Sequence, residues 1–398
     1  MEGRKCFITA SVPFAERRII IMEDSAINNY NIQCGIDYAV SRVDEGLKTF
    51  KETYPNSASV NCIYGQNTNT DWTNGFWSGM LWLAYEFTGN EKYENAAIRQ
   101  VGSYYQRILQ KIDVDHHDMG FLYIPSCVAA YKHTGNVTAR KAALLAADNL
   151  CSRFQEKGQF IQAWGQLGAS DNYRLIIDCL MNVPLLFWAE KETGKESYRK
   201  VAEAHLNTTA KVIMRDDAGT YHTYYFDPQT GEPLYGVTYQ GYADDSIWAR
   251  GQAWGIYGFA LAYRHTGKDV FKERFFRITE KFLLHLPEDN VPAWDMIFTD
   301  TKTQKDTSAA VIAVCGILEM AGLCQIPKYF IEKAMAMMKT LQETCFTTDI
   351  PNSNGILKHA VYSMPHNNGV NECNIWGDYY YMEALMRIVN PEWESYWG

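Results

Sequence analysis

The sequence predicts an all-α fold in which helical hairpins close into an α/α barrel. Apolar residues recur at helical spacing in about twelve segments, enough for six hairpins. Four helix ends carry nearly the same Thr-Gly turn, at Gly89, Gly135, Gly194 and Gly267. A glycine just after a helix allows the left-handed conformation that reverses the chain. Because these glycines are unevenly spaced, whereas a solenoid has a fixed repeat, we predict a closed ring rather than an open array.

Each hairpin pairs an apolar helix with a more polar helix that begins a few residues after the Thr-Gly turn. The apolar helices should therefore form an inner ring and the amphipathic helices an outer ring. The periodicity places the helices, in chain order, at residues 34–53, 75–88, 91–112, 119–133, 137–156, 175–192, 195–214, 245–265, 269–286, 307–324, 328–345 and 375–389.

Long segments rich in Trp, Asp, His and Gly run into six of these helices. In a closed ring, they should meet at one end, where the helix dipoles favour anions. Carboxylates and indoles cost free energy when they are buried without partners, so gathering them there makes a polar pocket with aromatic walls. A pocket of this kind is typical of an enzyme that acts on carbohydrate.

One segment departs from the helical pattern. Tyr221 to Phe226 is rich in aromatic residues and threonine, which predicts a strand, and Gly231 closes the turn that follows. We therefore expect a small β insertion near residues 219–240. No Pro-, Ser- or Gly-rich linker divides the chain, so we expect one barrel domain over residues 34–398, after a partly disordered N-terminal extension at residues 1–33.

The composition excludes several classes of partner. The formal net charge is -9 and no basic stripe is present, which argues against nucleic acid. No run approaches the ~20 apolar residues of a membrane span. The ten cysteines form no C-x-x-C pair, which is typical of reduced thiols in a cytoplasmic protein. We expect no membrane partner and a monomer or a weak homo-oligomer.

Two aspartates are the leading candidates for catalysis. Asp178 lies in an otherwise apolar helix start, where burial would raise its pKa, as a proton donor near neutral pH requires. A structural role, at a helix N-terminus or beside Arg174, is the alternative. Asp118 begins another helix pattern, and paired carboxylates leave one group protonated and one ionised. We therefore predict that Asp118 and Asp178 share one pocket.

The run Asp115-His116-His117-Asp118 could also be taken for a metal site. Adjacent histidines point away from each other in most backbones, and no Cys or Glu stands at ligand spacing. We predict that no metal binds there, and that His117 or a backbone donor orients Asp118.

Four tryptophans stand beside glycine or polar residues, in more exposed surroundings than a core Trp prefers. Stacking on a sugar ring is the functional interpretation, and packing within the barrel is the alternative. These residues are Trp72, Trp248, Trp254 and Trp376.

Three polar residues complete the candidate site. Arg250 has the bidentate geometry to bind a substrate carboxylate, or it could pair with Asp244 or Asp245. His222 and Gln240 lie in the inserted segment and could hydrogen-bond the sugar or act on water.

These motifs resemble the unsaturated glucuronyl hydrolases of glycoside hydrolase family 88. The likeness extends from about residue 34 to the C-terminus, through many ordered matches. They are Asp-Trp-Thr-Asn-Gly-Phe-Trp-Ser-Gly at 71–79, Asp-His-His-Asp-Met-Gly-Phe-Leu-Tyr at 115–123, Gln-Ala-Trp-Gly at 162–165, Ile-Ile-Asp-Cys at 176–179, His222 with Phe-Asp-Pro at 226–228, the run at 248–254, Asp-Thr-Ser-Ala at 306–309 and Ile-Trp-Gly-Asp-Tyr-Tyr-Tyr at 375–381.

The resemblance implies an (α/α)6 barrel, a bacterial enzyme and no cofactor. Its substrate would be an oligosaccharide with a 4,5-unsaturated uronic acid at the non-reducing end, as polysaccharide lyases leave on glycosaminoglycans. The acid/base aspartate of the family corresponds to Asp178 and its second aspartate to Asp118. Its substrate-contacting positions correspond to Trp72, His117, His222, Gln240, Arg250 and Trp254. We add Trp248, Ser363 and Trp376 to this set as candidates.

The chemistry implied is hydration of the C4=C5 enol ether. Asp178 would donate a proton to C4, and water would add at C5, activated by the same aspartate, while Asp118 steadies the developing charge. The C5 hemiketal would then open the ring, and the glycosidic bond would be lost as a consequence.

One departure bears on the substrate. Family members that favour sulfated disaccharides carry Ser-x-x-Ser-x-Lys before the last inner helix, where this chain has Ser363 followed by Met-Pro-His-Asn-Asn. Tyr239 also stands where an Arg would add positive charge. We predict a preference for unsulfated or weakly sulfated substrates.

Three alternatives stay open from the sequence. An unsaturated rhamnogalacturonyl hydrolase would share the barrel and the enol-ether chemistry but act on pectin fragments. An inverting glycosidase would hold two carboxylates ~6.5–9.5 Å apart around a water and cleave saturated substrates. A non-catalytic sugar-binding protein would leave its ligand unchanged.

Overall fold

The structure is a computed structural model that describes residues 31–398. Most of the N-terminal extension predicted at residues 1–33 lies outside the described residues. The last of its positions, Ile32 and Gln33, already belong to the first described helix, α3. The boundary at residue 34 and the division into one domain stay predictions.

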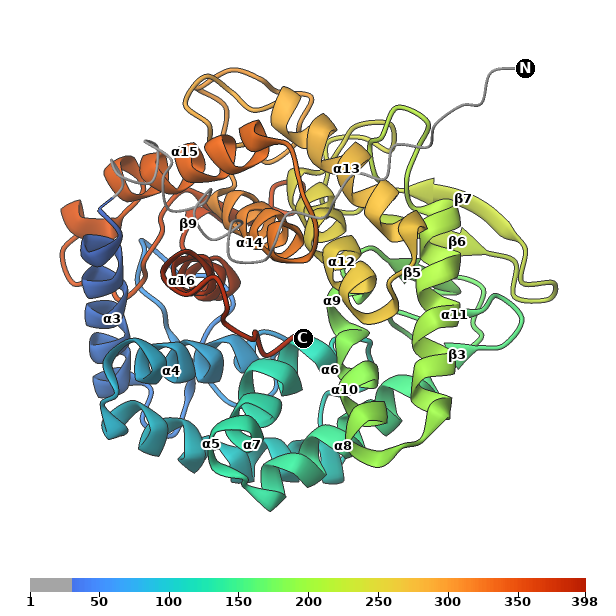
Figure 1. Cartoon of the computed structure of the whole chain (residues 1–398), viewed down its shortest axis with the longest axis horizontal. Coiled ribbons are helices and arrows are strands. Elements are labelled where there is room, and N and C mark those ends of the chain that lie inside the picture. The colour runs from blue at the N-terminus through green and yellow to red at the C-terminus, as the bar shows by residue number, and fades with distance from the viewer. Residues whose placement is uncertain (1–30) are drawn as a thin grey trace, which may run out of the picture.

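Two concentric rings of helices confirm the predicted all-α barrel (Figure 1). The outer ring of the described chain consists of α3 (Ile32–Thr49), α5 (Glu91–Leu109), α8 (Val137–Ser152), α11 (Glu196–Val212), α13 (Asp269–Leu284) and α15 (Lys328–Thr344). The inner ring consists of α4 (Asn74–Thr88), α6–η1–α7 (Met119–Tyr123, Ile124–Val128, Ala129–Thr134), α9–α10 (Cys179–Asn182, Pro184–Thr193), α12 (Ala249–Thr266), α14 (Thr307–Leu323) and α16 (Ile375–Val389). Contacts between α16 and α4 close the ring.

The four Thr-Gly turns have one common geometry. Gly89, Gly135, Gly194 and Gly267 have φ of +65°, +66°, +71° and +67°. At each turn the threonine hydroxyl donates to the carbonyl four residues earlier and accepts from the N–H two residues later. The left-handed glycine ends the inner helix, and the hydroxyl satisfies two backbone groups that the reversal leaves free.

The predicted β insertion is present as part of a three-stranded antiparallel sheet. Its order is β5 (Arg174–Ile176), β6 (Thr223–Phe226) and β7 (Pro233–Val237). The prediction of a helix from residue 175 is wrong, because this run pairs with β6 and the helix begins only at Cys179. A short apolar run has no periodicity that separates a buried strand from a buried helix.

Three further hairpins were not predicted. They occupy the long loops that precede inner helices, and they are β1 (Tyr54–Pro55) with β2 (Gln66–Asn67), β3 (Phe154–Gln155) with β4 (Phe160–Ile161), and β8 (Ala360–Ser363) with β9 (Asn368–Glu372). These loops and the N-termini of the inner helices gather at one end of the ring, which we call the mouth. Among residues 31–398, no helix is both long and apolar enough to cross a membrane.

Candidate active site

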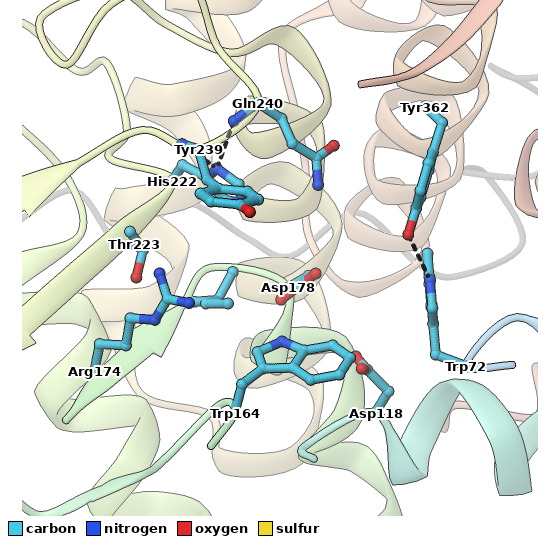
Figure 2. A pocket seen from close by; sticks show the side chains of 11 residues that line it. Trp72, Asp118, Trp164, Arg174, Asp178, His222, Thr223, Tyr239, Gln240 and Tyr362 are labelled. Carbon is cyan, nitrogen blue, oxygen red and sulfur yellow. Dashed lines mark hydrogen bonds between the residues drawn. The ribbon is translucent and has the colours of Figure 1, made fainter. Parts of the chain in front are cut away.

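A cavity of ≈ 300 Å³ opens at the mouth of the barrel (Figure 2). Segments far apart in the sequence supply its walls, including the loops before α4, α6, α9 and α12. The lining residues are Trp72, Asp118, Trp164, Arg174, Ile176, Asp178, His222, Thr223, Tyr239, Gln240 and Tyr362. The cavity therefore contains both predicted catalytic aspartates and three of the predicted binding residues.

The two aspartates meet because the helices that follow them touch. Asp118 immediately precedes α6, and Asp178 immediately precedes α9. Asn182 joins the two helix starts: its side chain accepts from the Phe121 N–H at 2.9 Å and donates to the Asp178 carbonyl at 3.2 Å. Gly120 permits this approach, since a Cβ there would lie 2.3 Å from the Asn182 Cα.

A single imidazole lies between the two carboxylates. His117 Nε2 is 3.3 Å from Asp118 Oδ1 and 3.4 Å from Asp178 Oδ1. His116 contacts the other oxygen, with Nδ1 3.1 Å from Asp118 Oδ2. The prediction that Asp118 and Asp178 share a pocket agrees with this geometry.

The surroundings drive the pKa values of the two carboxyl groups in opposite directions. Burial, reinforced by the nearby charge of Asp118, raises the pKa of Asp178 well above its ordinary value. Burial also opposes ionisation of Asp118, but His117, His116 and Asn182 outweigh it and hold the pKa of Asp118 below its ordinary value. Burial lowers the pKa of His117 to about 4. The two shifts have opposite sign, so Asp178 is biased towards its protonated form and Asp118 towards its ionised form, which is the arrangement of a general acid and its electrostatic partner.

The same three residues have the spacing of a cation site. One atom each from His117, Asp118 and Asp178 lies within 4.8 Å of the others. Three protein ligands with an open position would suit a catalytic zinc ion. The raised pKa of Asp178 opposes metal binding, however, because metal ligands must be deprotonated. The predicted absence of a metal stays a prediction, and chelation tests it.

Aromatic side chains form the walls around the aspartates. Trp72 donates its indole N–H to the Tyr362 hydroxyl at 3.0 Å, and the two rings lie nearly parallel. Trp164 stacks on His116 with a centroid distance of 5.0 Å and is 38% exposed. Trp72 is one of the predicted binding residues, whereas Trp164 and Tyr362 are not among them. Trp164 stands beside Gly165, a signal that would have found it, whereas Tyr362 lies on the unpredicted strand β8.

His222 and Gln240 lie in the cavity wall above Asp178 (Figure 2). His222 Nδ1 accepts from the N–H groups of Tyr239 and Gln240, at 3.0 and 3.3 Å. Since burial lowers the pKa of His222 to about 3, the ring is neutral and its proton resides on Nε2. The ring therefore has a fixed tautomer with one N–H left to donate.

Arg250 lies behind the cavity wall. It pairs with Asp306 at 2.7 Å, donates to Gln240 Oε1 at 2.6 Å, and donates to the carbonyls of Val361 and Tyr362. The predicted alternative of a pair with Asp244 or Asp245 is wrong, because the partner is Asp306. With these acceptors in place, Arg250 holds Gln240 and Tyr362 rather than facing the cavity.

Five other predicted binding residues also lie outside the cavity lining. Trp254 and Trp376 are buried beneath it and pack on Phe121 and Trp72, respectively, as the packing alternative expects. Trp248 packs against the ring of His222, and Ser363 hydrogen-bonds His366. His117 lies between the aspartates, as described above.

The chain is similar to known proteins over most of its length. The model of Glycosyl Hydrolase Family 88 matches residues 44–388. An unsaturated chondroitin disaccharide hydrolase of Streptococcus pneumoniae is 48% identical, over 91% of this chain and 92% of its own length. An unsaturated glucuronyl hydrolase of Bacillus sp. strain GL1 is 41% identical, over 89% of this chain and 96% of its own length.

Solved structures extend the likeness to the fold. Unsaturated glucuronyl hydrolase from Streptococcus agalactiae superposes with a TM-score of 0.89 at 45% identity, and the match covers 100% of both chains. An unsaturated glucuronyl hydrolase specific for heparin superposes with a TM-score of 0.84 at 30% identity, covering 92% of this chain and 98% of that chain. The chain therefore belongs to glycosyl hydrolase family 88, within its group of unsaturated glucuronyl hydrolases.

Proposed function

We propose that this enzyme removes the 4,5-unsaturated uronic acid from the non-reducing end of glycosaminoglycan disaccharides and oligosaccharides produced by lyases. The observation that carries the proposal is that Asp118 and Asp178 face one imidazole in one cavity, where the pKa of Asp178 is raised and that of Asp118 is lowered. Two related structures hold ligands with this kind of end, dGlcA-GalNAc6S on a Streptococcus agalactiae mutant and dGlcA-Glc-Rha-Glc on another mutant.

The reaction is a hydration that destroys the glycosidic bond indirectly. Asp178 donates its proton to C4 of the enol ether, which leaves oxocarbenium character on C5 and the ring oxygen. Water adds to C5 and returns a proton to Asp178, so the carboxyl group is restored. The C5 hemiketal opens the ring, and the C1 hemiacetal that results releases the next sugar as an alcohol. One water is consumed in each turnover.

The neighbouring side chains assist this step without taking a proton. Asp118 stabilises the positive charge that develops on the ring, and its ionised state at neutral pH suits that task. Trp72 and Trp164 offer flat faces to the sugar. His222 Nε2–H and the Gln240 amide are positioned to hydrogen-bond the uronate.

The separation of the carboxylates argues against an ordinary inverting glycosidase. Oxygen atoms of Asp118 and Asp178 lie within 4.8 Å of each other. An inverting pair needs about 6.5–9.5 Å to hold a water between its carboxyl groups. The relatives named above are glucuronyl and chondroitin enzymes, which favours the proposed activity over the rhamnogalacturonyl alternative.

The positions that correspond to the sulfate-related residues of similar enzymes carry Tyr239, His366 and Asn368 in this chain. Tyr239 packs against His366 with a centroid distance of 4.8 Å, and Ser363 is engaged by His366. Asn368 stands where the related motif has lysine. These residues support a preference for unsulfated or weakly sulfated substrates. Markedly faster turnover of sulfated than of unsulfated chondroitin disaccharide would refute it.

We also propose that the enzyme works as a monomer or a weak homo-oligomer in the bacterial cytoplasm, without metal or organic cofactor. Gel filtration with light scattering tests the oligomeric state. Activity that survives prolonged dialysis against EDTA supports the metal-free mechanism, whereas loss of activity that zinc restores would refute it.

The decisive assay follows the ultraviolet absorbance of the conjugated ene-uronate. We expect it to fall when the enzyme meets lyase-generated disaccharides and to persist with the Asp178→Asn variant. An unchanged substrate after long incubation would indicate a sugar-binding protein. Turnover confined to pectin fragments would indicate the rhamnogalacturonyl activity instead.

A further inference from the structure

Arg174 places a guanidinium without a carboxylate partner in the wall of the cavity. It is the only Lys or Arg among the described residues that line the cavity. Its Nε has no hydrogen-bond partner, and none of the ion pairs found among residues 31–398 includes it. Its guanidinium carbon lies 5.4 Å from the centre of the Tyr225 ring, which limits its freedom. A cavity-lining cation without a carboxylate partner is suited to bind an anion.

Arg250 provides the contrast within the same site. Its guanidinium is 3% exposed and is occupied by Asp306, Gln240 and two backbone carbonyls. The charge of Arg250 is therefore neutralised within the protein, whereas that of Arg174 is available to a ligand.

The sheet extends the cavity outward on the Arg174 side. Arg174 pairs with Tyr225 on β6, and Tyr225 pairs with Tyr235 on β7. Directly paired residues share one face of a sheet, so this row lies on the same face as the cavity-lining Ile176 and Thr223. The two tyrosine rings stack at 5.2 Å, and Tyr235 is 54% exposed. The face thus presents a cation followed by two aromatic rings.

An adjoining cavity offers a less favourable direction for an anionic chain. It shares Trp72, Trp164 and Tyr362 with the first cavity, but its other residues include Asp71, Asp113 and Asp115. Asp115 pairs with Arg153, but Asp71 and Asp113 are in none of the ion pairs found among residues 31–398 and would repel a sulfated or uronate-bearing sugar. Figure 2 shows Arg174 and Thr223 across the cavity from Trp72 and Tyr362. A sugar chain leaving the aspartates can therefore extend either towards Arg174 and the sheet or towards the adjoining acidic cavity.

We propose that Arg174, Tyr225 and Tyr235 form a subsite for an oxyanion-bearing sugar beyond the unsaturated uronate. The oxyanion is either the carboxylate of the third sugar in a longer fragment or a sulfate on the second sugar, and the second case would oppose the preference for unsulfated substrates proposed above. The inference rests on the proposed function, because it assumes that the uronate occupies the space beside Asp178.

Three unsaturated substrates separate the two sources: an unsulfated disaccharide, a monosulfated disaccharide and an unsulfated tetrasaccharide. Arg174→Gln should raise KM about tenfold for the substrate that supplies the oxyanion, and much less for the unsulfated disaccharide. A rise in KM for the sulfated disaccharide would show that Arg174 binds a sulfate. A rise in KM for the tetrasaccharide would show that it binds a carboxylate. Arg174→Lys keeps the charge and should therefore raise KM for that substrate by a smaller factor than Arg174→Gln. Tyr235→Ala should also weaken binding of the same substrate, by a smaller factor than Arg174→Gln.

The matched control is Arg99→Gln, which removes an exposed arginine from outer helix α5 and should leave all three substrates unaffected. Equal losses on all three substrates with Arg174→Gln, or no loss on any of them, would overturn the subsite. Binding is measured separately in an Asp178→Asn background, through the fluorescence of the tryptophans that line the cavity. If the wild-type enzyme consumed no substrate while Arg174→Gln still weakened binding of the anion-bearing fragment, the proposed activity would be refuted and the proposed subsite would be supported.

Discussion

The two ends of the barrel bury carboxylates in opposite ways. At the mouth, Asp178 Oδ1 has no hydrogen-bond partner and lies near the like charge of Asp118. At the other end, which we call the base, Glu319 and Glu383 are at least as deeply buried. There, Arg387 lies 2.6 Å from Glu319 and 3.0 Å from Glu383.

Further donors complete the network at the base. Arg264 pairs with Glu319, the Tyr257 hydroxyl donates to Glu383, and the Trp397 indole donates to Glu383 at 2.8 Å. Burial alone would raise the pKa of Glu319, but Arg387 and Arg264 hold it below its ordinary value. The partners therefore decide what a buried carboxylate does. A buried carboxyl group that has cationic partners stays ionised and stabilises the fold. One without such partners has a raised pKa and can serve as a proton donor.

The largest expected effect comes from removing the proton donor at the mouth. Asp178→Asn should lower kcat about 10³-fold, since a positioned general acid contributes about 10²–10⁴-fold. The free energy of unfolding should stay unchanged or rise, because the variant removes a poorly solvated carboxyl group. Absorbance kinetics and chemical denaturation measure the two quantities. A loss of less than tenfold in kcat would show that another group supplies the proton.

The opposite result is expected at the base. Arg387→Met leaves Glu319 and Glu383 buried without their shared cation, which should cost about 3–5 kcal/mol in the free energy of unfolding. Molecules that remain folded should keep their kcat, because the network lies at the far end from the cavity. Urea denaturation gives the first quantity and active-site-normalised kinetics the second. A variant with native stability would mean that the base network does not hold the fold.

The pH dependence of kcat/KM should report the mouth alone. Activity requires protonated Asp178, whose pKa is raised, so activity falls as pH rises through that value, about tenfold per unit. It also requires ionised Asp118, whose pKa is lowered, so the acid limb lies below the ordinary range of aspartate. Between the two limbs the rate should be flat. A profile that rises with pH where Asp178 ionises would reverse its role from acid to base.

The stability of the ion-pair network at the base of the barrel should fall as pH falls, whereas activity at the mouth should fall as pH rises. The folded-state pKa of Glu319 lies below its ordinary value, so its contribution is complete above the unfolded pKa and is lost as pH falls through the folded one. A fall in pH should therefore lower the stability that Glu319 contributes at the base of the barrel. Asp178 at the mouth remains protonated, and thus able to donate its proton, over the same pH range.

The two aspartates of the cavity could be singled out from the sequence because a carboxylate within an apolar run stands out from its neighbours. The inner ring and the four turns could be predicted for a similar reason, since periodicity and Thr-Gly punctuation are local. Asp118 and Asp178 were both recognisable, whereas the contact that unites them depends on Asn182, whose role only the folded chain reveals.

Features that depend on distant partners were missed. The partner of Arg250 is Asp306, which lies on a different loop from the predicted Asp244 and Asp245. Tyr362 carries no local signal, because its position in the wall depends on a hairpin with weak strand character. Trp254 looked exposed from its small neighbours, but those neighbours allow helices to pack closely around it.

The smallest effect tests whether the turns at the base act only on stability. Gly194 has φ of +71°, and no atom lies within 4 Å of an added Cβ, so Gly194→Ala meets backbone strain without a steric clash. We expect a loss of about 1 kcal/mol in the free energy of unfolding and unchanged kcat and KM. Gly102→Ala is the matched control, because it also meets open space but lies within helix α5, where alanine is favoured and should stabilise. If Gly194→Ala instead altered kcat at constant stability, the two ends of the barrel would be coupled, and the division between a structural base and a reactive mouth would fail.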